Sequence, residues 1–356
     1  SRSNSEKIVG GGYAEKYGEP QHINVPDDIK AELLQNLKKM EAYMAEVATN
    51  PEYDDVRAEC KNREHRCLYW AWQGECKANA KYMQLHCAPV CHSCDLLDYD
   101  KRCPKEPNAP NALQPGDLNK LFERIVAEQE KVTILSRPDY PEREDETNST
   151  YGIGPWVITI DDFISPEETE RLIELGSNQG YERSTDVGKK KFDGTYEAKQ
   201  SKSRTSTNAW CSDDRCYKDP LAQSATAKIE KLTGIPETNY EYLQLLKYHI
   251  GQYYRAHHDY IEHDTYRPYG PRILTAFLYL TDVEEGGGTN FPTLDLTVLP
   301  KRGRMLLWPS VLDEDPKSID IRTRHQALDV EKGTKFAANA WIHLRNFKAA
   351  HEKGCT

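Results

Sequence analysis

Long hydrophobic runs are missing from this chain of 356 residues, and no stretch approaches the roughly 20 apolar residues of a membrane-spanning helix. Excess basic charge is missing too, because 47 Lys and Arg face 57 Asp and Glu, for a formal net charge of -10. Phosphate neutralisation needs a basic face, so no nucleic acid is expected as a partner. The chain begins at Ser1 rather than at a methionine, and we assign any signal or membrane anchor to a removed precursor segment.

Paired C-x2-C knuckles, the usual sign of a zinc site, are nearly absent, since only Cys91 and Cys94 have that spacing. Seven of the ten cysteines nevertheless lie between Cys60 and Cys103. Cysteines this dense favour disulfides and therefore an oxidising compartment. We expect the secretory pathway, in the lumen of the endoplasmic reticulum or Golgi. An N-glycosylation acceptor at Asn148, which makes the chain a candidate glycoprotein, agrees with that location.

The order of periodic segments predicts an α+β protein. Apolar residues at helical spacing run from Leu33 to Val47, and a capping box at Ser165 starts a helix that we end at Gly176. Later β-rich runs separated by turns favour an antiparallel sandwich or jelly roll. We divide the chain into an N-terminal tail and amphipathic helix (1–55), a disulfide-rich segment (56–103), a linker with one helix (104–150) and a β-rich domain (151–356).

The strongest chemical signal is the triplet His257-x-Asp259 together with a distant histidine, His325. Side chains alternate across a strand, so His257 and Asp259 share one face while His258 points to the other. Two histidines and one carboxylate can occupy one face of iron(II) and leave positions open for an oxidant and a co-substrate. We therefore predict a non-haem iron site.

Lys335 follows His325 closely and supplies a cation for a dicarboxylate. We expect the two residues to approach each other across a hairpin whose turn is centred near 330–333. The alternative for Lys335 is a surface position, against which the apolar residues after it argue. The polar stretch 181–202 is either a lid that orders over a bound peptide or a solvated insertion without a role.

The cysteine-rich segment resembles the ShKT (ShK toxin-like) domain, on six cysteine spacings and the string WAWQGEC that ends at Cys76. Such a domain is too small for a real core and depends on its bridges. No partner is predicted for it. The family pairing implies the disulfides Cys60–Cys94, Cys67–Cys87 and Cys76–Cys91. Parity among the remaining cysteines suggests the pairs Cys211–Cys216 and Cys103–Cys355.

From Gly154 to Phe347 the chain resembles the prolyl 4-hydroxylases of the iron(II)/2-oxoglutarate dioxygenase superfamily, of the procollagen-proline type. The matching strings are RTS at 204–206, EYLQLLKY at 241–248, GQYY at 251–254, HHD at 257–259, EEGG at 284–287, TNFP at 289–292, GTK at 333–335 and WIH at 341–343. The resemblance implies a double-stranded β-helix (jelly roll) catalytic domain with supporting helices. It also implies hydroxylation of proline in a proline-rich polypeptide by O2 and 2-oxoglutarate, with release of succinate and CO2.

The resemblance further implies a role for each matched position. Iron(II) would be held by His257, Asp259 and His325. The 2-oxoglutarate would be bound by Lys335, Tyr248 and Thr289, with ascorbate as a further cofactor. The peptide groove would be lined by Arg204, Ser206, Glu241, Tyr254, Arg272, Trp341 and His343. An aromatic groove suits the preformed ridge of a polyproline II helix.

Other functions stay open. The same iron and 2-oxoglutarate chemistry could act on another residue, such as lysine, or on a small molecule. A secreted binding protein with a vestigial metal site is a different class, against which the retention of all three ligands and Lys335 argues. A zinc hydrolase could also use two histidines and an aspartate, but it would not need Lys335.

Overall fold

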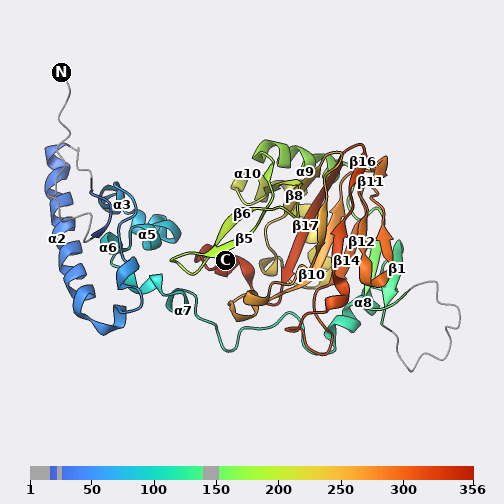
Figure 1. Cartoon of the computed structure of the whole chain (residues 1–356), viewed down its shortest axis with the longest axis horizontal. Coiled ribbons are helices and arrows are strands. Elements are labelled where there is room, and N and C mark those ends of the chain that lie inside the picture. The colour runs from blue at the N-terminus through green and yellow to red at the C-terminus, as the bar shows by residue number, and fades with distance from the viewer. Residues whose placement is uncertain (1–16, 22–25, 139–151) are drawn as a thin grey trace, which may run out of the picture. The chain divides into compact units, whose positions relative to one another are not determined.

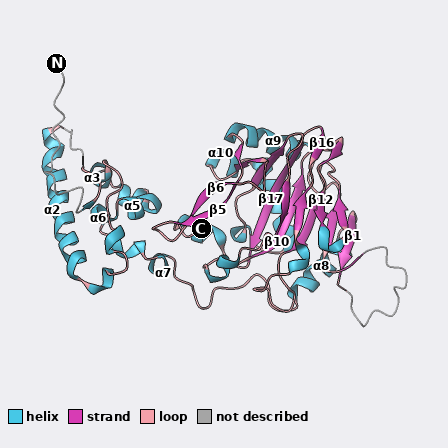
Figure 2. Cartoon of the chain, viewed as in Figure 1, coloured by secondary structure: helices cyan, strands magenta, loops and turns pink. Residues whose placement is uncertain are grey.

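The computed structural model describes residues 17–21, 26–138 and 152–356 (Figures 1 and 2). Its contacts divide the chain into two compact units. Unit 1 comprises residues 1–106, 188–197 and 349–356, and unit 2 comprises 107–187 and 198–348. Among the described residues, no helix has the length and apolar character needed to cross a bilayer. The Asn148 acceptor lies outside the described residues.

Unit 1 packs short helices against one long amphipathic helix, α2 (Asp27–Thr49), whose buried face comprises Leu33, Leu37, Met40, Met44 and Val47. The other helices are η1 (Pro51–Tyr53), η2 (Arg57–Glu59), α3 (Cys67–Trp72), α4 (Glu75–Ala78), α5 (Ala80–His86), α6 (Ala88–Cys91), η3 (Cys94–Leu97) and α7 (Tyr99–Arg102). The expected helix is therefore present, and it shares one core with the cysteine-rich segment. The boundary that we expected near residue 55 falls inside this unit.

Five disulfides take up all ten cysteines. They are Cys60–Cys94, Cys67–Cys87, Cys76–Cys91, Cys103–Cys355 and Cys211–Cys216. The first three lie within residues 60–94, and Cys103–Cys355 ties the C-terminal residues to unit 1. Such cross-links stabilise mainly by restricting the unfolded chain.

Residues 181–202 contain strand β4 (Glu182–Arg183) and a hairpin of β5 (Thr185–Lys190) and β6 (Tyr196–Gln200). The tip of the hairpin belongs to unit 1. There the guanidinium of Arg63 lies 3.4 Å from the ring centroid of Phe192, and Arg102 donates a hydrogen bond to the carbonyl of Asp193. The segment is thus built of strands, and its ordering over a peptide stays a prediction.

Unit 2 is a mixed helix and strand fold around a large sheet, as the sequence predicted for this part of the chain. Its helices are α8 (Asp117–Glu128), α9 (Pro166–Gln179), α10 (Asp214–Tyr217), α11 (Pro220–Thr233), η4 (Glu237–Asn239), η5 (Glu262–Tyr266), η6 (Pro292–Leu294) and η7 (Ile321–Thr323), and α12 (Phe347–Glu352) runs past its end. Its other strands are β1 (Val132–Arg137), β2 (Gly152–Ile153), β3 (Val157–Ile160), β7 (Thr207–Trp210), β8 (Gln244–Tyr248), β9 (Tyr254–His257), β10 (Arg272–Tyr279), β11 (Glu285–Gly286), β12 (Thr289–Phe291), β13 (Leu296–Val298), β14 (Met305–Pro309), β15 (His325–Ala327), β16 (Val330–Lys332) and β17 (Lys335–His343).

The large sheet has the order β2-β1-β3-β14-β10-β17-β8-β7-β4, and a smaller sheet has the order β13-β12-β15-β9 (Figure 1). Strand parity gives the large sheet two buried faces. Leu274, Ala276 and Leu278 of β10 pack with helices α8, α9 and α11, whereas Phe277 and Tyr279 face the smaller sheet. The space between the two sheets is therefore where polar groups of a site could be held away from water.

Helix α9 corrects one expectation from the sequence. Ser165 forms the predicted capping box with Glu168, but the helix continues through Gly176 to Gln179, with Gly180 as its C-cap. Gly176 is required for packing and not for termination, since a Cβ there would lie 2.2 Å from the hydroxyl oxygen of Tyr181. That hydroxyl is buried without a hydrogen-bond partner.

We expect Gly176→Ala to lower the free energy of unfolding by about 1–3 kcal/mol, because the added methyl group overpacks this contact. Tyr181→Phe should be nearly neutral alone and should recover part of the loss in the double variant, since it removes the clashing oxygen. Denaturant unfolding of the two single variants and the double variant measures this coupling. Ser177→Ala, next to Gly176 on the same helix, is the matched control. Additive losses in the double variant would contradict the packing role.

Candidate active site

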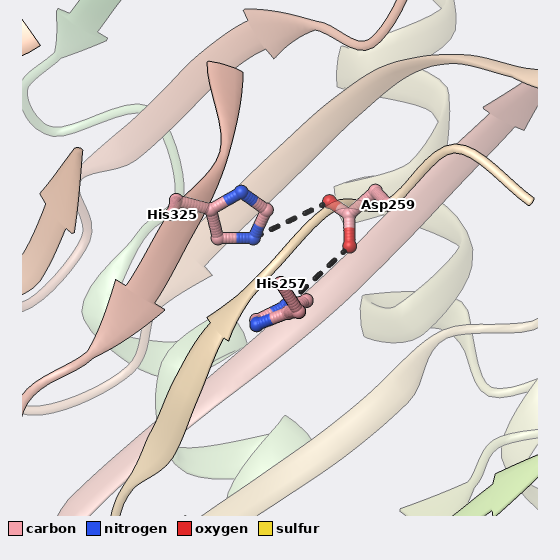
Figure 3. A group of neighbouring side chains, drawn as sticks. All are labelled: His257, Asp259 and His325. Carbon is pink, nitrogen blue, oxygen red and sulfur yellow. Dashed lines mark ion pairs between the residues drawn. The ribbon is translucent and has the colours of Figure 1, made fainter. Parts of the chain in front are cut away.

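Three side chains from two strand ends converge between the sheets (Figure 3). His257 ends β9 and His325 begins β15, and these two residues are direct cross-strand partners. The Nε2 atoms of His257 and His325 lie 3.8 and 3.7 Å from the two carboxylate oxygens of Asp259. One candidate ligand atom from each residue lies within 4.8 Å of the others, and in the described part of the chain this is the one group of its kind. The arrangement matches a facial two-histidine, one-carboxylate metal site.

Hydrogen bonds orient each of these three side chains. The Nδ1 atoms of His257 and His325 lie 2.8 and 3.0 Å from the carbonyl oxygens of Arg255 and Thr323, so that Nε2 stays available to a metal. The hydroxyl of Thr275 donates to Asp259 Oδ2 at 2.6 Å. A donor set held by such outer partners fits a resident metal ion.

His258 points away from the group, as the sequence predicted. Its Nε2 lies 2.7 Å from the carbonyl oxygen of Asp320 and 3.0 Å from the hydroxyl of Thr323, and its Nδ1 accepts from the backbone N–H of Tyr260. The predicted cause is not the one observed, however. The strand ends at His257, so the orientation of His258 comes from its hydrogen bonds after the strand and not from the alternation of side chains along it.

Burial and neighbouring charges favour a neutral His257 and an ionised Asp259, which are the forms that bind a metal. Burial lowers the pKa of His257 well below its ordinary value, which favours the neutral imidazole. Burial alone raises the pKa of Asp259, but the two imidazoles, Arg272 and the Thr275 hydroxyl outweigh it and lower this pKa to about 2. Asp259 is therefore a carboxylate at neutral pH.

Lys335 is completely buried, and among the described residues no ion pair joins it to a carboxylate. Its Nζ donates to the carbonyl of Gly287 at 2.7 Å and lies 5.2, 5.2 and 5.5 Å from the ring centroids of Tyr248, Phe277 and Tyr279. Desolvation lowers its pKa to about 7. A buried cation without a counter-charge is costly, so the site fits an anionic ligand.

The expected hairpin between His325 and Lys335 is wrong. His325 pairs with β9 in the smaller sheet, whereas Lys335 pairs with Tyr248 of β8 in the large sheet. The intervening β16 pairs with β11. Both residues nevertheless contact the aromatic cluster between the sheets, His325 through Trp308 and Lys335 through Phe277. The two residues are therefore brought near each other by the packing of the two sheets and not by a hairpin turn.

The two other predicted 2-oxoglutarate residues belong to the same interior layer. Tyr248 is 2% exposed and lies opposite Lys335 on the neighbouring strand. Thr289, on β12, accepts a hydrogen bond of 2.7 Å from the hydroxyl of Tyr279. Tyr279 thus touches both Thr289 and the surroundings of Lys335, although the sequence reading did not single it out.

The predicted groove residues form two clusters, each in contact with a metal ligand. In the first, Arg204 donates to Ser206 Oγ at 3.2 Å and lies 4.8 Å from the ring centroid of Tyr254, which stacks on His257 at 3.5 Å. Arg204 also donates to Gln244 at 2.8 Å.

The second cluster surrounds Glu241. Its Oε1 accepts from Arg272 at 2.5 Å and lies 2.9 Å from Nε2 of His343. Burial raises the pKa of Glu241, but Arg272 and His343 outweigh it and lower this pKa to about 2. Arg272 also lies 3.8 Å from the ring centroid of Trp341 and donates to the Asp259 carbonyl at 3.4 Å. Both clusters are therefore coupled to the metal ligands.

Sequence reasoning missed Thr275 and Tyr279, which hold Asp259 and Thr289. Both are polar residues in a strand whose other members are almost all apolar, and they are the fourth and eighth residues of β10, on the same face of the strand. Two polar groups at period two in a fully buried strand are a usable signal for a site-facing side.

Comparisons with known proteins agree with this site. The family described as 2OG-Fe(II) oxygenase superfamily matches residues 243–343. Prolyl 4-hydroxylase 5 of Arabidopsis thaliana is 32% identical over 215 residues, covering 54% of this chain and 70% of that protein. Prolyl 4-hydroxylase subunit alpha-1 of Rattus norvegicus is 32% identical over 199 residues, covering 54% of this chain and 35% of that protein. A solved viral collagen prolyl hydroxylase from Paramecium Bursaria Chlorella virus-1, in a 2OG complex, is 28% identical with a TM-score of 0.42, covering 53% of this chain and 97% of that chain.

Fold and site are those of the 2-oxoglutarate and iron(II) oxygenase class that the sequence predicted. The chain belongs to the prolyl 4-hydroxylase family of these enzymes. It spans 35% of the length of the rat alpha-1 subunit that it matches. The family implies Fe(II) and 2-oxoglutarate, and the donor set around Asp259 and the uncompensated Lys335 fit both.

Replacing Thr275 by valine should weaken Fe(II) binding about 10- to 100-fold, because Asp259 loses the hydrogen bond that orients it. Anaerobic titration with Fe(II) measures the affinity. Thr159→Val on β3 is a matched control, since Thr159 is also buried and has no hydrogen bond to a ligand. Equal affinity of the two variants would exclude an orienting role for Thr275.

The affinity for 2-oxoglutarate should depend on the protonation of Lys335. We expect the ammonium form to bind the distal carboxylate, and burial lowers the pKa of Lys335 to about 7. The Kd should therefore be nearly constant below that pH and rise about tenfold per pH unit above it. Calorimetry under nitrogen with Fe(II)-loaded protein measures this. Pyruvate lacks the distal carboxylate and serves as the control ligand; a parallel rise of its Kd would assign the pH dependence to other groups.

Proposed function

We propose that this protein is a peptidyl-proline 4-hydroxylase that consumes O2 and 2-oxoglutarate and releases succinate and CO2. The observation that carries the proposal is the buried, uncompensated Lys335 in the same interior layer as a two-histidine, one-aspartate group. A hydrolytic metal site has no use for such a cation. A vestigial site would have no reason to keep so costly a group buried.

Each residue of the site has a task in the reaction. Iron(II), when bound, would activate O2, which is the oxidant for the substrate C–H bond, while 2-oxoglutarate supplies two electrons and leaves as succinate and CO2. His257, Asp259 and His325 hold the metal on one face, and Lys335 holds the distal carboxylate of the co-substrate. Packing of Phe291 and Trp308 against His325 excludes water from that side. Ascorbate is proposed as the reductant that keeps the iron ferrous.

The proline substrate is supported by the two groove clusters. The clusters contain two aromatic rings, Tyr254 and Trp341, and the guanidinium of Arg204 or Arg272 lies over one face of each, so a peptide would meet the remaining ring surface. A polyproline II segment presents pyrrolidine rings to such faces and leaves its carbonyl oxygens free to accept hydrogen bonds. We take Glu241 and His343 to position Arg272, since both are almost fully buried.

The five disulfides support a luminal location in the secretory pathway, in the endoplasmic reticulum or Golgi. We propose that residues 56–103 are a ShKT domain that serves as a spacer or docking module. Its Lys81 and Tyr82 are engaged within unit 1, because Lys81 Nζ lies 3.1 Å from His351 Nε2 and the Tyr82 hydroxyl donates to Glu64 at 3.1 Å. Channel-blocking toxins of the ShK family carry a Lys-Tyr dyad at the matching positions, whereas here both residues of the pair are engaged by neighbours within unit 1, which supports a spacer or docking role.

The function is tested by incubating the intact chain with Fe(II), ascorbate, 2-oxoglutarate, O2 and a panel of peptides. Proline-rich peptides should gain the mass of one oxygen atom on proline, with one succinate released per hydroxylation. Asp259→Asn should abolish both products, because it removes the anionic metal ligand. A matched peptide set with lysine in place of proline tests the other residue class. Hydroxylation of the lysine set alone, or none of either set by metal-loaded protein, would refute proline hydroxylation.

A further inference from the structure

Trp210 is an exposed indole with no task in the site described so far. It ends β7, and 39% of its surface is exposed, which is unusual for so large an apolar side chain. It is the cross-strand partner of Gln244 on β8, and Gln244 is the partner of Asn339 on β17. Because partners across a sheet face the same side, Trp210 lies on the face that carries Asn339, Trp341 and Lys335.

A series of contacts leads from the metal ligands to this indole. Arg272 donates to the carbonyl of Asp259 and lies 3.8 Å from the ring centroid of Trp341. The rings of Trp341 and Trp210 have centroids 6.1 Å apart and are inclined by 44°. Trp341 is 5% exposed, whereas Trp210 is open to solvent. The series therefore passes from the buried metal group to the surface of unit 2.

We propose that Trp210 and Trp341, called here the indole ledge, bind a residue of the peptide that flanks the target proline. Trp210 is then a specificity-determining residue that senses the length and proline content of the substrate. This inference rests on the proposed function and adds a subsite that lies beyond the reacting residue.

The chemistry of the ledge favours a pyrrolidine ring. Two inclined aromatic faces form a corner that a rigid apolar ring fills with little loss of conformational entropy, and a polyproline II segment is already extended. The indole N–H of Trp341 is buried and has no hydrogen-bond partner among the described residues. A small shift of this side chain on binding would let it donate to a peptide carbonyl, as tryptophan does in other aromatic grooves.

The test compares a short peptide, which holds the target proline and one residue on each side, with a long repeat of the same sequence. Trp210→Ala should raise the KM for the long peptide about five- to tenfold and leave its kcat unchanged, because a flanking contact contributes only to binding. The KM for the short peptide should stay within about twofold. Trp210→Phe keeps an aromatic face and should recover most of the affinity.

Leu299→Ala is the matched control, because Leu299 is also an exposed apolar residue, at 63%, and lies outside the ledge. Thermal unfolding and Fe(II) affinity of each variant verify that fold and metal site are intact. An unchanged KM of Trp210→Ala for the long peptide, or an equal rise for both peptides, would overturn the ledge while leaving proline hydroxylation in place. Failure of the wild-type chain to hydroxylate either peptide would instead remove the proposed function, and the ledge with it.

Discussion

The register between β15 and β9 is the constraint on which the site depends. It sets His325 directly opposite His257, at the end of one strand and the start of the other. A slip of one residue would turn one imidazole to the other side of its strand and leave Asp259 with a single histidine. Local hydrogen bonds from the Nδ1 atoms to the carbonyls of Arg255 and Thr323 fix the orientation of the two rings, and Thr275 of the facing sheet holds Asp259 in place. The carboxylate thus links the small sheet to the large one.

The burial of Lys335 lowers the stability of the folded protein and at the same time provides a cation for an anionic ligand. Its pKa of about 7 lies far below that of an exposed lysine, so the unfolded chain binds one more proton between that pH and about 10.4. The stability that the folded state loses by burying a charged Lys335 is lost in full below the lower pKa. This loss declines as the pH rises through the window and is absent above it. Three aromatic rings and one carbonyl offset only part of the desolvation. A bound dicarboxylate would complete the site and stabilise the folded state by mass action.

Sequence patterns predicted the long helix α2, the capping box at Ser165 and β-rich runs such as the one that forms β10, because periodicity and caps are local properties. The metal residues were found from chemistry and motif strings. The pattern could not reveal that Gly176 serves packing, since its neighbour Tyr181 lies beyond the helix end. Nor could it show that His325 and Lys335 belong to different sheets, which depends on long-range pairing. The roles assigned to Thr275 and Trp210 depend on contacts with residues far away in the sequence. Residue spacing along the chain does not reveal such contacts.

Stoichiometric Fe(II) binding under anaerobic conditions tests the central claim most directly. The intact chain should bind one Fe(II), and both His325→Ala and Asp259→Asn should lose at least about 100-fold in affinity, since each removes one of three ligands. His258→Ala serves as the comparison, because this neighbouring imidazole faces Asp320 and not the metal group. Wild-type affinity in either ligand variant, or a greater loss in His258→Ala than in both, would contradict the assignment of His257, Asp259 and His325 as the metal site.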